Sequence, residues 1–230
     1  MLLYLSTNTR PDISFAVSQL ARFSNNPKQN HAKAMKHLIR YLRGTKDKGT
    51  IIRPSLELMF NMWVDADFMG LYNVEPHVDP TAARSRMAYI ICLGNWPIAW
   101  KSTLIAHICQ SSFESEYAGI SYALKMLIPI QKMVQELLVA IDNKKLTKEQ
   151  VKIKARVFED NQAAYNVAKN QRITSRTRYM LNKWHWFHQE LNKGTFTIEH
   201  CPTDRQWADW MTKPLDRSKG LVIQSAQRLG

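Results

Sequence analysis

The chain has 230 residues, of which 45% are hydrophobic and 22% are charged. That length suits one compact domain with an appendage, whose core needs no disulfide or metal for folding. Lys and Arg number 32 against 19 acidic residues, and the formal net charge of +13 favours nucleic acid as a partner, with an anionic membrane second. The three cysteines are odd in number and lack CxxC spacing, which argues against a secreted disulfide framework and favours a reducing compartment.

No apolar stretch reaches the roughly 18 residues that a membrane-spanning helix needs. The longest one, at 88–100, is interrupted by Gly94, Asn95 and Pro97. The apolar N-terminus at 1–5 has no basic segment before it and is followed by polar residues, so it does not resemble a signal peptide. The sequence therefore predicts a protein without a membrane segment.

Positive charge is concentrated in the first 53 residues, which hold ten basic and two acidic side chains. Two helices are predicted there, the first beginning near Pro11 and the second ending at Gly44. The second helix carries an apolar stripe around Leu38. Its other faces form either a solvated surface or a phosphate-binding surface, and carry four basic residues: Lys33, Lys36, Arg40 and Arg43.

From about Leu56 onward, strand and helix patterns alternate. A period of two predicts strands at about 56–65, 86–93, 96–101, 151–160 and 196–200, with Gly94-Asn95 as a tight hairpin turn. Helical periodicity predicts helices at about 113–139, 162–169 and 179–191. Strands in hairpins followed by alternating helices and strands imply a mixed sheet of the α+β or α/β class.

Three local signals refine the predicted helices. Pro129 should kink or divide the helix at 113–139. Ser111 and Glu114 form a predicted capping box at the start of that helix. Thr203 and Gln206 form a second one, opening a last helix that contains Asp209.

Four acidic residues lie where a carboxylate should cost free energy. Glu116 shares a helical stripe with apolar residues, and Asp65 and Asp160 lie where predicted strands end. Asp209 lies in the first turns of the last predicted helix, beside two tryptophans. Burying a lone carboxylate costs on the order of several kcal/mol unless it is paired or bound to a metal.

Most of these acids also have an ordinary structural explanation. Asp160 would cap the helix that follows it, and Asp209 would complement a helix dipole. Asp65 would be a turn residue. Asp67, two residues later, is an alternative to Asp65 for any function assigned to that acid. Together, however, four carboxylates on separate elements with no basic residue beside each predict a site for a divalent cation. Oxygen ligands favour Mg²⁺ or Mn²⁺ over zinc.

Other common catalytic and metal-binding patterns receive little support. His107 and Cys109, with His200 and Cys201, offer zinc ligands, but their spacing matches no structural zinc pattern. The two cysteines are expected to be small core residues. The sequence contains no Gly-rich phosphate loop and no Gly-x-Ser-x-Gly motif.

Over nearly its whole length the sequence resembles the pol region of a copia-type LTR retrotransposon. The first motifs resemble the end of a reverse transcriptase: Thr9-Arg10-Pro11-Asp12-Ile13, Ala21-Arg22-Phe23 and Arg40-Tyr41-Leu42-Arg43-Gly44-Thr45. The later motifs resemble an RNase H domain, in order: Asp65-Ala66-Asp67-Phe68, Arg84-Ser85-Arg86, Trp100-Lys101-Ser102, Ser111-Ser112-Phe113-Glu114-Ser115-Glu116-Tyr117, Glu159-Asp160-Asn161-Gln162, Ser175-Arg176-Thr177, Ala208-Asp209 and Thr212-Lys213.

The resemblance implies an α/β (mixed α+β) RNase H-like fold, with a five-stranded mixed sheet flanked by helices and a small N-terminal helical segment. The implied domains are 1–53 from the end of the reverse transcriptase, 56–215 as the RNase H-like domain and 216–230 as a C-terminal tail. The implied activity is hydrolysis of the RNA strand of an RNA–DNA hybrid with two metal ions, Mg²⁺ or Mn²⁺. The family's catalytic, metal-binding acids map onto Asp65, Glu116, Asp160 and Asp209. The resemblance thus implies Asp65, and not Asp67, as the first acid of the site.

Substrate contacts should be made mainly to the backbone of the hybrid, which is recognised by its shape, phosphates and 2′-hydroxyls. Helix capping competes with substrate binding as the role of one of two candidate serines. In the aromatic segment around His185, packing in the core is the alternative to substrate binding. The candidate substrate-binding residues are Asn161, Gln162, Arg176, Arg178, Ser111, Ser112 and His185.

Two features depart from the family pattern. Met87-Ala88 stands where relatives carry a small polar residue and Gly, a packing change that should leave the chemistry intact. No Tyr-x-Asp-Asp motif occurs, so this chain alone should not polymerise DNA. It resembles a fragment or degenerate copy of a longer polyprotein.

An active ribonuclease H that works during reverse transcription is the main interpretation. The alternatives are a catalytically inactive relic that binds nucleic acid and a module that docks to a separate polymerase chain. The expected partners are an RNA–DNA hybrid and the polymerase part of a reverse transcriptase, with no membrane. The expected location is inside the cell, in a cytoplasmic virus-like particle or in the nucleus.

Overall fold

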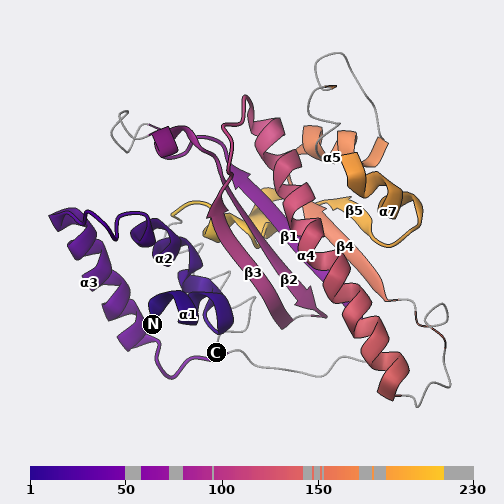
Figure 1. The fold of residues 1–230 in the computed structure, drawn as a ribbon, viewed down its shortest axis with the longest axis horizontal. Coiled ribbons are helices and arrows are strands. Elements are labelled where there is room, and N and C mark those ends of the chain that lie inside the picture. The colour runs from indigo at the N-terminus through magenta and orange to yellow at the C-terminus, as the bar shows by residue number, and fades with distance from the viewer. Residues whose placement is uncertain are drawn as a thin grey trace.

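The computed structural model describes residues 1–49, 58–72, 80–94, 96–141, 147, 151, 153–170, 178 and 185–214. A central sheet separates the N-terminal helices at one edge from α5 and α7 near the other, and α4 crosses one face of the sheet (Figure 1). Within the described parts of the chain, no helix is long and apolar enough to cross a membrane.

The sheet has five strands in the order β3-β2-β1-β4-β5. Strand β1 (Met59–Asp67) pairs antiparallel with β2 (Arg86–Leu93), and β2 pairs antiparallel with β3 (Trp96–Leu104). Strands β4 (Lys154–Glu159) and β5 (Thr197–His200) continue the sheet in parallel from β1. This mixed, five-stranded order confirms the RNase H-like fold that the sequence predicts.

Strands β1 and β3 extend beyond their predicted ends, β3 to Leu104 in place of about residue 101. The polar residues after Val64 suggest that β1 ends at Asp65, but the strand continues to Asp67. Asp65 pairs with Ala88 and Asp67 with Arg86 on the antiparallel neighbour β2. Backbone pairing with β2 therefore extends the strand beyond its apolar pattern, and Asp65 lies inside it.

Helix α4 (Ser112–Ile141) packs on one face of the sheet. Pro129 lies inside this helix without dividing it, contrary to one of the two predicted outcomes. Both Pro129 and Lys125, whose carbonyl has no helical donor as a result, are exposed, so water can solvate that carbonyl. The core beneath α4 is built from alternating strand residues and the apolar stripe of the helix, among them Phe60, Met62, Val64, Val157, Ile120, Leu124 and Leu127.

Three shorter helical elements follow β4 and complete this side of the sheet. Helix α5 (Gln162–Asn170) follows β4 as predicted. A 3₁₀ turn, η3 (His185–Phe187), leads into α7 (His188–Asn192). Gly194 closes α7 in the left-handed region, with φ of 71°, as its sequence position predicts.

The other face of the sheet is covered by the segment after β5. This segment forms two 3₁₀ turns, η4 (Thr203–Arg205) and η5 (Asp209–Met211), and the predicted helix with its capping box is wrong. Gln206 has extended backbone angles, and its side-chain amide donates to the carbonyl of Val64 at 2.9 Å. This contact with β1 interrupts the helix. The cluster beneath the segment contains Ala88, Ile90, Cys92, Ala208 and Met211, surrounded by Trp63, Trp100, Trp207 and Trp210.

The first 44 residues form helices α1 (Leu2–Asn8), α2 (Ser14–Ala21) and α3 (Gln29–Gly44), with η1 (Pro11–Ile13) between the first two. They share a small core of Ile13, Val17 and Leu38. Helix α1 had no counterpart among the predicted elements. The predicted boundary between residues 53 and 56 lies outside the described residues, so the division into domains stays a prediction. A further 3₁₀ turn, η2 (Pro80–Ala83), precedes β2.

Arg86 joins the N-terminal helices to the sheet. Its side chain is only 2% exposed and donates to the Ser18 hydroxyl at 2.9 Å and to the Gln19 side-chain oxygen, both on α2. It also donates to the Ser102 hydroxyl at 3.1 Å, and Ser102 in turn donates to the carbonyl of Met211 at 2.5 Å. One guanidinium therefore connects α2, β3 and the segment that carries η5.

Candidate active site

Three of the predicted acids meet at one end of the sheet. Single ligand atoms of Asp65, Glu116 and Asp160 all lie within 4.8 Å of one another. In the parallel pair β1–β4, Trp63 lies opposite Phe158, and this register carries Asp65 level with Asp160 just beyond β4. The parallel pairing thus brings together two acids that are 95 residues apart in sequence.

Glu116 reaches the same place from α4. The helix lies close to β1 at Gly119, where an added Cβ would come within 3.3 Å of a methyl group of Val64. This close approach holds Glu116 against the strand, where the backbone N–H of Ala66 donates a hydrogen bond to it. Glu116 is 6% exposed, as its place on the apolar stripe predicts.

Asp209 lies beside this cluster, at the start of η5, but it is not one of the three converging carboxylates in the described structure. Lys213 forms an ion pair with Asp209, which corrects the expectation that no acid has a basic neighbour. The Thr212 hydroxyl donates to the carboxylate of Asp65 and lies 3.0 Å from the carbonyl oxygen of Asp209. The motif Thr212-Lys213 thus links two of the predicted acids.

Burial and mutual repulsion favour protons on the carboxyl groups of Asp65 and Glu116. Burial is the largest cause that raises the pKa of Asp65 to about 7, and the charges of Asp209 and Asp160 add to it. Burial, followed by the charges of Glu159, Asp65 and Asp160, raises the pKa of Glu116 well above its ordinary value. A bound cation would reverse this preference by stabilising the charged forms.

Asp65 and Asp67 lie in different surroundings. The carboxylate of Asp67 lies against Gly70, so closely that an added Cβ at Gly70 would overlap it. Asp67 therefore belongs to the turn that follows β1, while Asp65 belongs to the cluster.

Asp160 does not cap the helix that follows it. The side-chain oxygen of Asn161 accepts hydrogen bonds from the N–H groups of Ala163 and Ala164, both at 3.0 Å, and so caps α5. This leaves the carboxylate of Asp160 to the acidic cluster.

Glu159 is an acid at the site that the sequence reading passed over. It is fully buried and continues the inward alternation of Ala155 and Val157 on β4. It accepts a hydrogen bond from the N–H of Asn161 at 3.1 Å, and burial raises its pKa well above the ordinary value. Its inward register position on β4 was the signal that could have identified it.

The predicted substrate-binding residues are in different situations. Gln162 is exposed at the start of α5 and donates to Asn166, and Ser112 is exposed at the start of α4. The hydroxyl of Ser111 accepts from the N–H of Glu114 at 3.1 Å, so helix capping, the competing role, holds for this serine. Glu114 completes the cap by accepting from the N–H of Gln110 at 2.7 Å, one residue earlier than a capping box requires.

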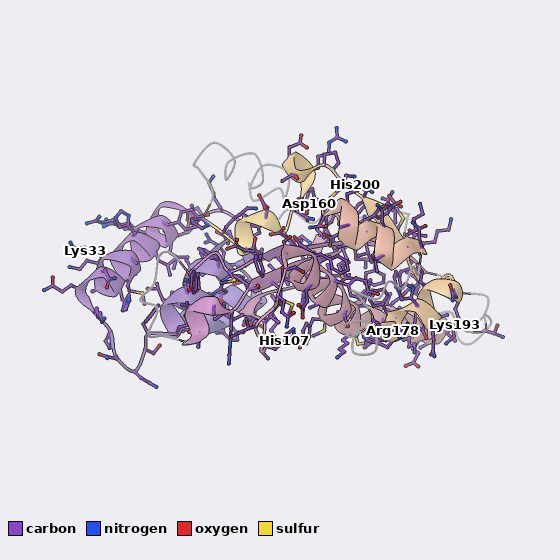
Figure 2. All side chains as sticks on the ribbon, turned by 90° about the horizontal axis from the view of Figure 1, so that it is seen from above. Lys33, His107, Asp160, Arg178, Lys193 and His200 are labelled. Atoms are coloured by element: carbon purple, nitrogen blue, oxygen red, sulfur yellow. The ribbon has the colours of Figure 1, made fainter. Side chains whose placement is uncertain are left out.

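Of the three other candidates, the structure places only Arg178. Arg176 and the side chain of His185 lie outside what the structure describes. Arg178 is exposed, and Figure 2 shows it on the opposite side of the molecule from Asp160. His200, in contrast, lies beside Asp160, with 3.1 Å between its Nε2 and the carbonyl oxygen of Asp160 (Figure 2).

No family model matches the chain. A retrovirus-related Pol polyprotein from transposon RE1 of Arabidopsis thaliana is 30% identical over 210 residues, which are 91% of this chain and 13% of that protein. One from transposon TNT 1-94 of Nicotiana tabacum is 29% identical over 218 residues, or 95% of this chain and 15% of that protein. Over more than nine tenths of its length, the chain is therefore homologous to Pol polyproteins of copia-type transposons.

The copia-type relatives are much longer than this chain, which spans only 13–15% of their length. Among solved structures, LC11-RNase H1 isolated from compost aligns with 67% of this chain and 92% of its own, at 14% identity and a TM-score of 0.46. At that score the superposition is loose, and it is the strand order of the sheet that identifies the RNase H-like fold.

The residues of the cluster suit a hard divalent cation. All converging donors are carboxylate oxygens, which Mg²⁺ and Mn²⁺ prefer. One buried oxygen of Glu116, Oε2, has no hydrogen-bond partner among the described residues. A buried oxygen without a donor is costly, and a bound cation would satisfy it.

Proposed function

We propose that this chain is a metal-dependent ribonuclease H that hydrolyses the RNA strand of an RNA–DNA hybrid. The observation that carries the proposal is the convergence of Asp65, Glu116 and Asp160 within 4.8 Å on an RNase H-like sheet. Homology to the Pol polyproteins of copia-type transposons supports it, because reverse transcription produces such hybrids. Its place of action would be inside the cell, in a virus-like particle or the nucleus.

Divalent ions, when bound, supply an activated water and stabilise the charge on the leaving 3′-oxygen. Asp65, Glu116 and Asp160 would hold them, and Asp209 would complete the set from the other side. Thr212 orients the carboxylate of Asp65 through its hydroxyl, and the N–H of Ala66 does the same for Glu116. The chain thus fixes its ligands before the substrate arrives.

The substrate would be held chiefly by its phosphates. Asn161 uses its side-chain oxygen to cap α5, which leaves its amide nitrogen to face the backbone of the hybrid beside Asp160. Helix α3 presents exposed Lys33, Lys36 and Arg40 at the far end of the molecule, where Figure 2 shows Lys33. We propose that this helix extends the binding track, so that affinity falls steeply as salt rises.

The test is cleavage of a labelled RNA–DNA hybrid by the full chain in Mg²⁺, with an EDTA control. Asp160→Asn should lower the rate by about 100-fold or more, because a lost ligand removes several kcal/mol of transition-state stabilisation. The matched control is Asp204→Asn, which removes an exposed acid from η4 and should leave the rate unchanged.

A loss of less than tenfold in Asp160→Asn would exclude this assignment of the site. Salt-sensitive binding of the hybrid without any cleavage, in Mg²⁺ or Mn²⁺, would show instead that the chain is a binding relic or needs a polymerase partner.

A further inference from the structure

The loop between β3 and α4 brings together three side chains that the proposed ribonuclease does not use. His107, Cys109 and Glu114 each offer one ligand atom, and these atoms lie within 4.8 Å of one another. Figure 2 shows His107 on the opposite side of the molecule from Asp160 and His200. The cluster is therefore separate from the acidic site, and it does not include the His200-Cys201 pair considered from sequence.

The three donors are spaced almost as in a metal site. Sγ of Cys109 lies 3.8 Å from Nε2 of His107, which lies 4.0 Å from Oε1 of Glu114. Around a tetrahedral zinc ion with ordinary bond lengths, neighbouring donors would be about 3.3–3.7 Å apart. These two pairs of donors would each need to close by less than about 1 Å.

Glu114 is held in a suitable orientation by the start of α4. Its Oε2 accepts the hydrogen bond from the N–H of Gln110 at 2.7 Å, and its own N–H donates to Ser111. These two bonds fix the carboxylate with Oε1 toward His107. Hydrogen bonds of this kind orient the ligands of natural metal sites.

Burial and charge also suit a divalent ion. Cys109 and Glu114 are 1% and 4% exposed, whereas a quarter of the His107 side chain faces solvent and gives an ion a way in. A thiolate, a carboxylate and a neutral imidazole together carry a charge of about −2, which would cancel that of the ion and limit the cost of burying it.

We propose that His107, Cys109 and Glu114 bind one transition-metal ion of the zinc class, independently of the acidic site. A sulfur, a nitrogen and a single oxygen donor select Zn²⁺ over Mg²⁺. The bound ion would tie the loop to the first turn of α4, the helix that carries Glu116. Binding would release the thiol proton of Cys109.

The experiment is titration of the full chain with Co²⁺ under reducing, anaerobic conditions, followed by optical absorption. The expected result is one thiolate-bound Co²⁺ per chain, with a thiolate-to-cobalt charge-transfer band and the visible bands of tetrahedral cobalt, and added Zn²⁺ should remove these bands. Cys109→Ser should abolish the charge-transfer band. His107→Ala, at a partly exposed position, should weaken Co²⁺ binding about tenfold or more without unfolding the chain.

Two control variants separate this site from the rest of the molecule. Cys201→Ser should keep the charge-transfer band, since Cys201 lies at the end of β5. Asp65→Asn should also keep it, even though it disables the acidic site. Absence of the band in the unaltered chain, its persistence in Cys109→Ser, or unchanged affinity in His107→Ala would each overturn the proposal. In that event the contacts among the three side chains are ordinary hydrogen bonds and an ion pair.

Discussion

Asp12 and Asp65 are both buried aspartates, and their surroundings are opposite. Asp12, in the N-terminal helices, accepts hydrogen bonds from Arg10 at 2.6 and 2.9 Å and from the Tyr41 hydroxyl at 2.8 Å. Arg10 also donates to the Thr45 hydroxyl at 2.7 Å. Asp65, in the sheet, accepts from the Thr212 hydroxyl and otherwise faces the carboxylates of Glu116 and Asp160.

The difference separates an acid that stabilises the fold from acids that cost stability. The Asp12 network joins two sequence motifs, Thr9-Arg10-Pro11-Asp12-Ile13 and Arg40-Tyr41-Leu42-Arg43-Gly44-Thr45, and its charges are matched. The Asp65 cluster gathers like charges away from water, which no folding requirement explains. Buried carboxylates without matching cations therefore indicate a binding site, and three variants would break or sharpen this comparison.

Asp12→Asn should have the largest effect on stability. The substitution keeps the shape but leaves the guanidinium of Arg10 without its charged partner, and we expect a loss of about 2–3 kcal/mol in the free energy of unfolding. Urea denaturation would measure it. The exposed Asp204→Asn should change stability by less than about 0.5 kcal/mol. Equal stability of the two variants would show that the Asp12 network is not structural.

Asp65→Asn should act in the opposite direction when no metal is bound. In EDTA at pH 8 the substitution removes a desolvated charge, and we expect a gain of about 1–2 kcal/mol, while activity in Mg²⁺ is lost. Thermal unfolding in EDTA would measure the stability, and the cleavage assay in Mg²⁺ would measure the activity. Destabilisation in EDTA would mean that Asp65 is paired in the folded chain, as Asp12 is.

The pH dependence provides an independent check on the same variant. The pKa of Asp65 is raised from 3.8 to about 7, so the folded chain binds the proton more tightly than the unfolded chain does. The metal-free chain should therefore lose stability as pH rises from about 4 through 7. Asp65→Asn should flatten this slope, and an unchanged slope would contradict the assigned shift.

Lys213→Met should have the smallest effect. Its ammonium group pairs with Asp209 and competes with a divalent ion for that carboxylate. A half-buried ion pair is worth on the order of 1 kcal/mol, so the Mg²⁺ concentration for half-maximal cleavage should fall up to about fivefold. Lys193→Met removes a pair with Glu190 that is away from the site and serves as control. A higher Mg²⁺ requirement in Lys213→Met would show that Lys213 supports metal binding.

Much of the fold and the main acids could be predicted because their signals are local. The alternation of apolar and polar residues predicted the strands of the sheet. The position of a carboxylate on the apolar stripe of α4 predicted that Glu116 is buried. The last predicted helix failed because Gln206 is bonded to Val64, 142 residues away, and no local pattern reports such a contact. Glu159 was not predicted, because the prediction rested on Asp160 at the end of the strand and not on the buried face of β4.

Arg86 has a consequence for how this chain can evolve. Its guanidinium is buried in the sheet, yet two of its acceptors, Ser18 and Gln19, belong to helix α2 in the N-terminal segment. A recombination event that joined this sheet to helices lacking those acceptors would leave a buried cation poorly solvated. We therefore expect residues 18, 19 and 86 to change together among relatives of this chain.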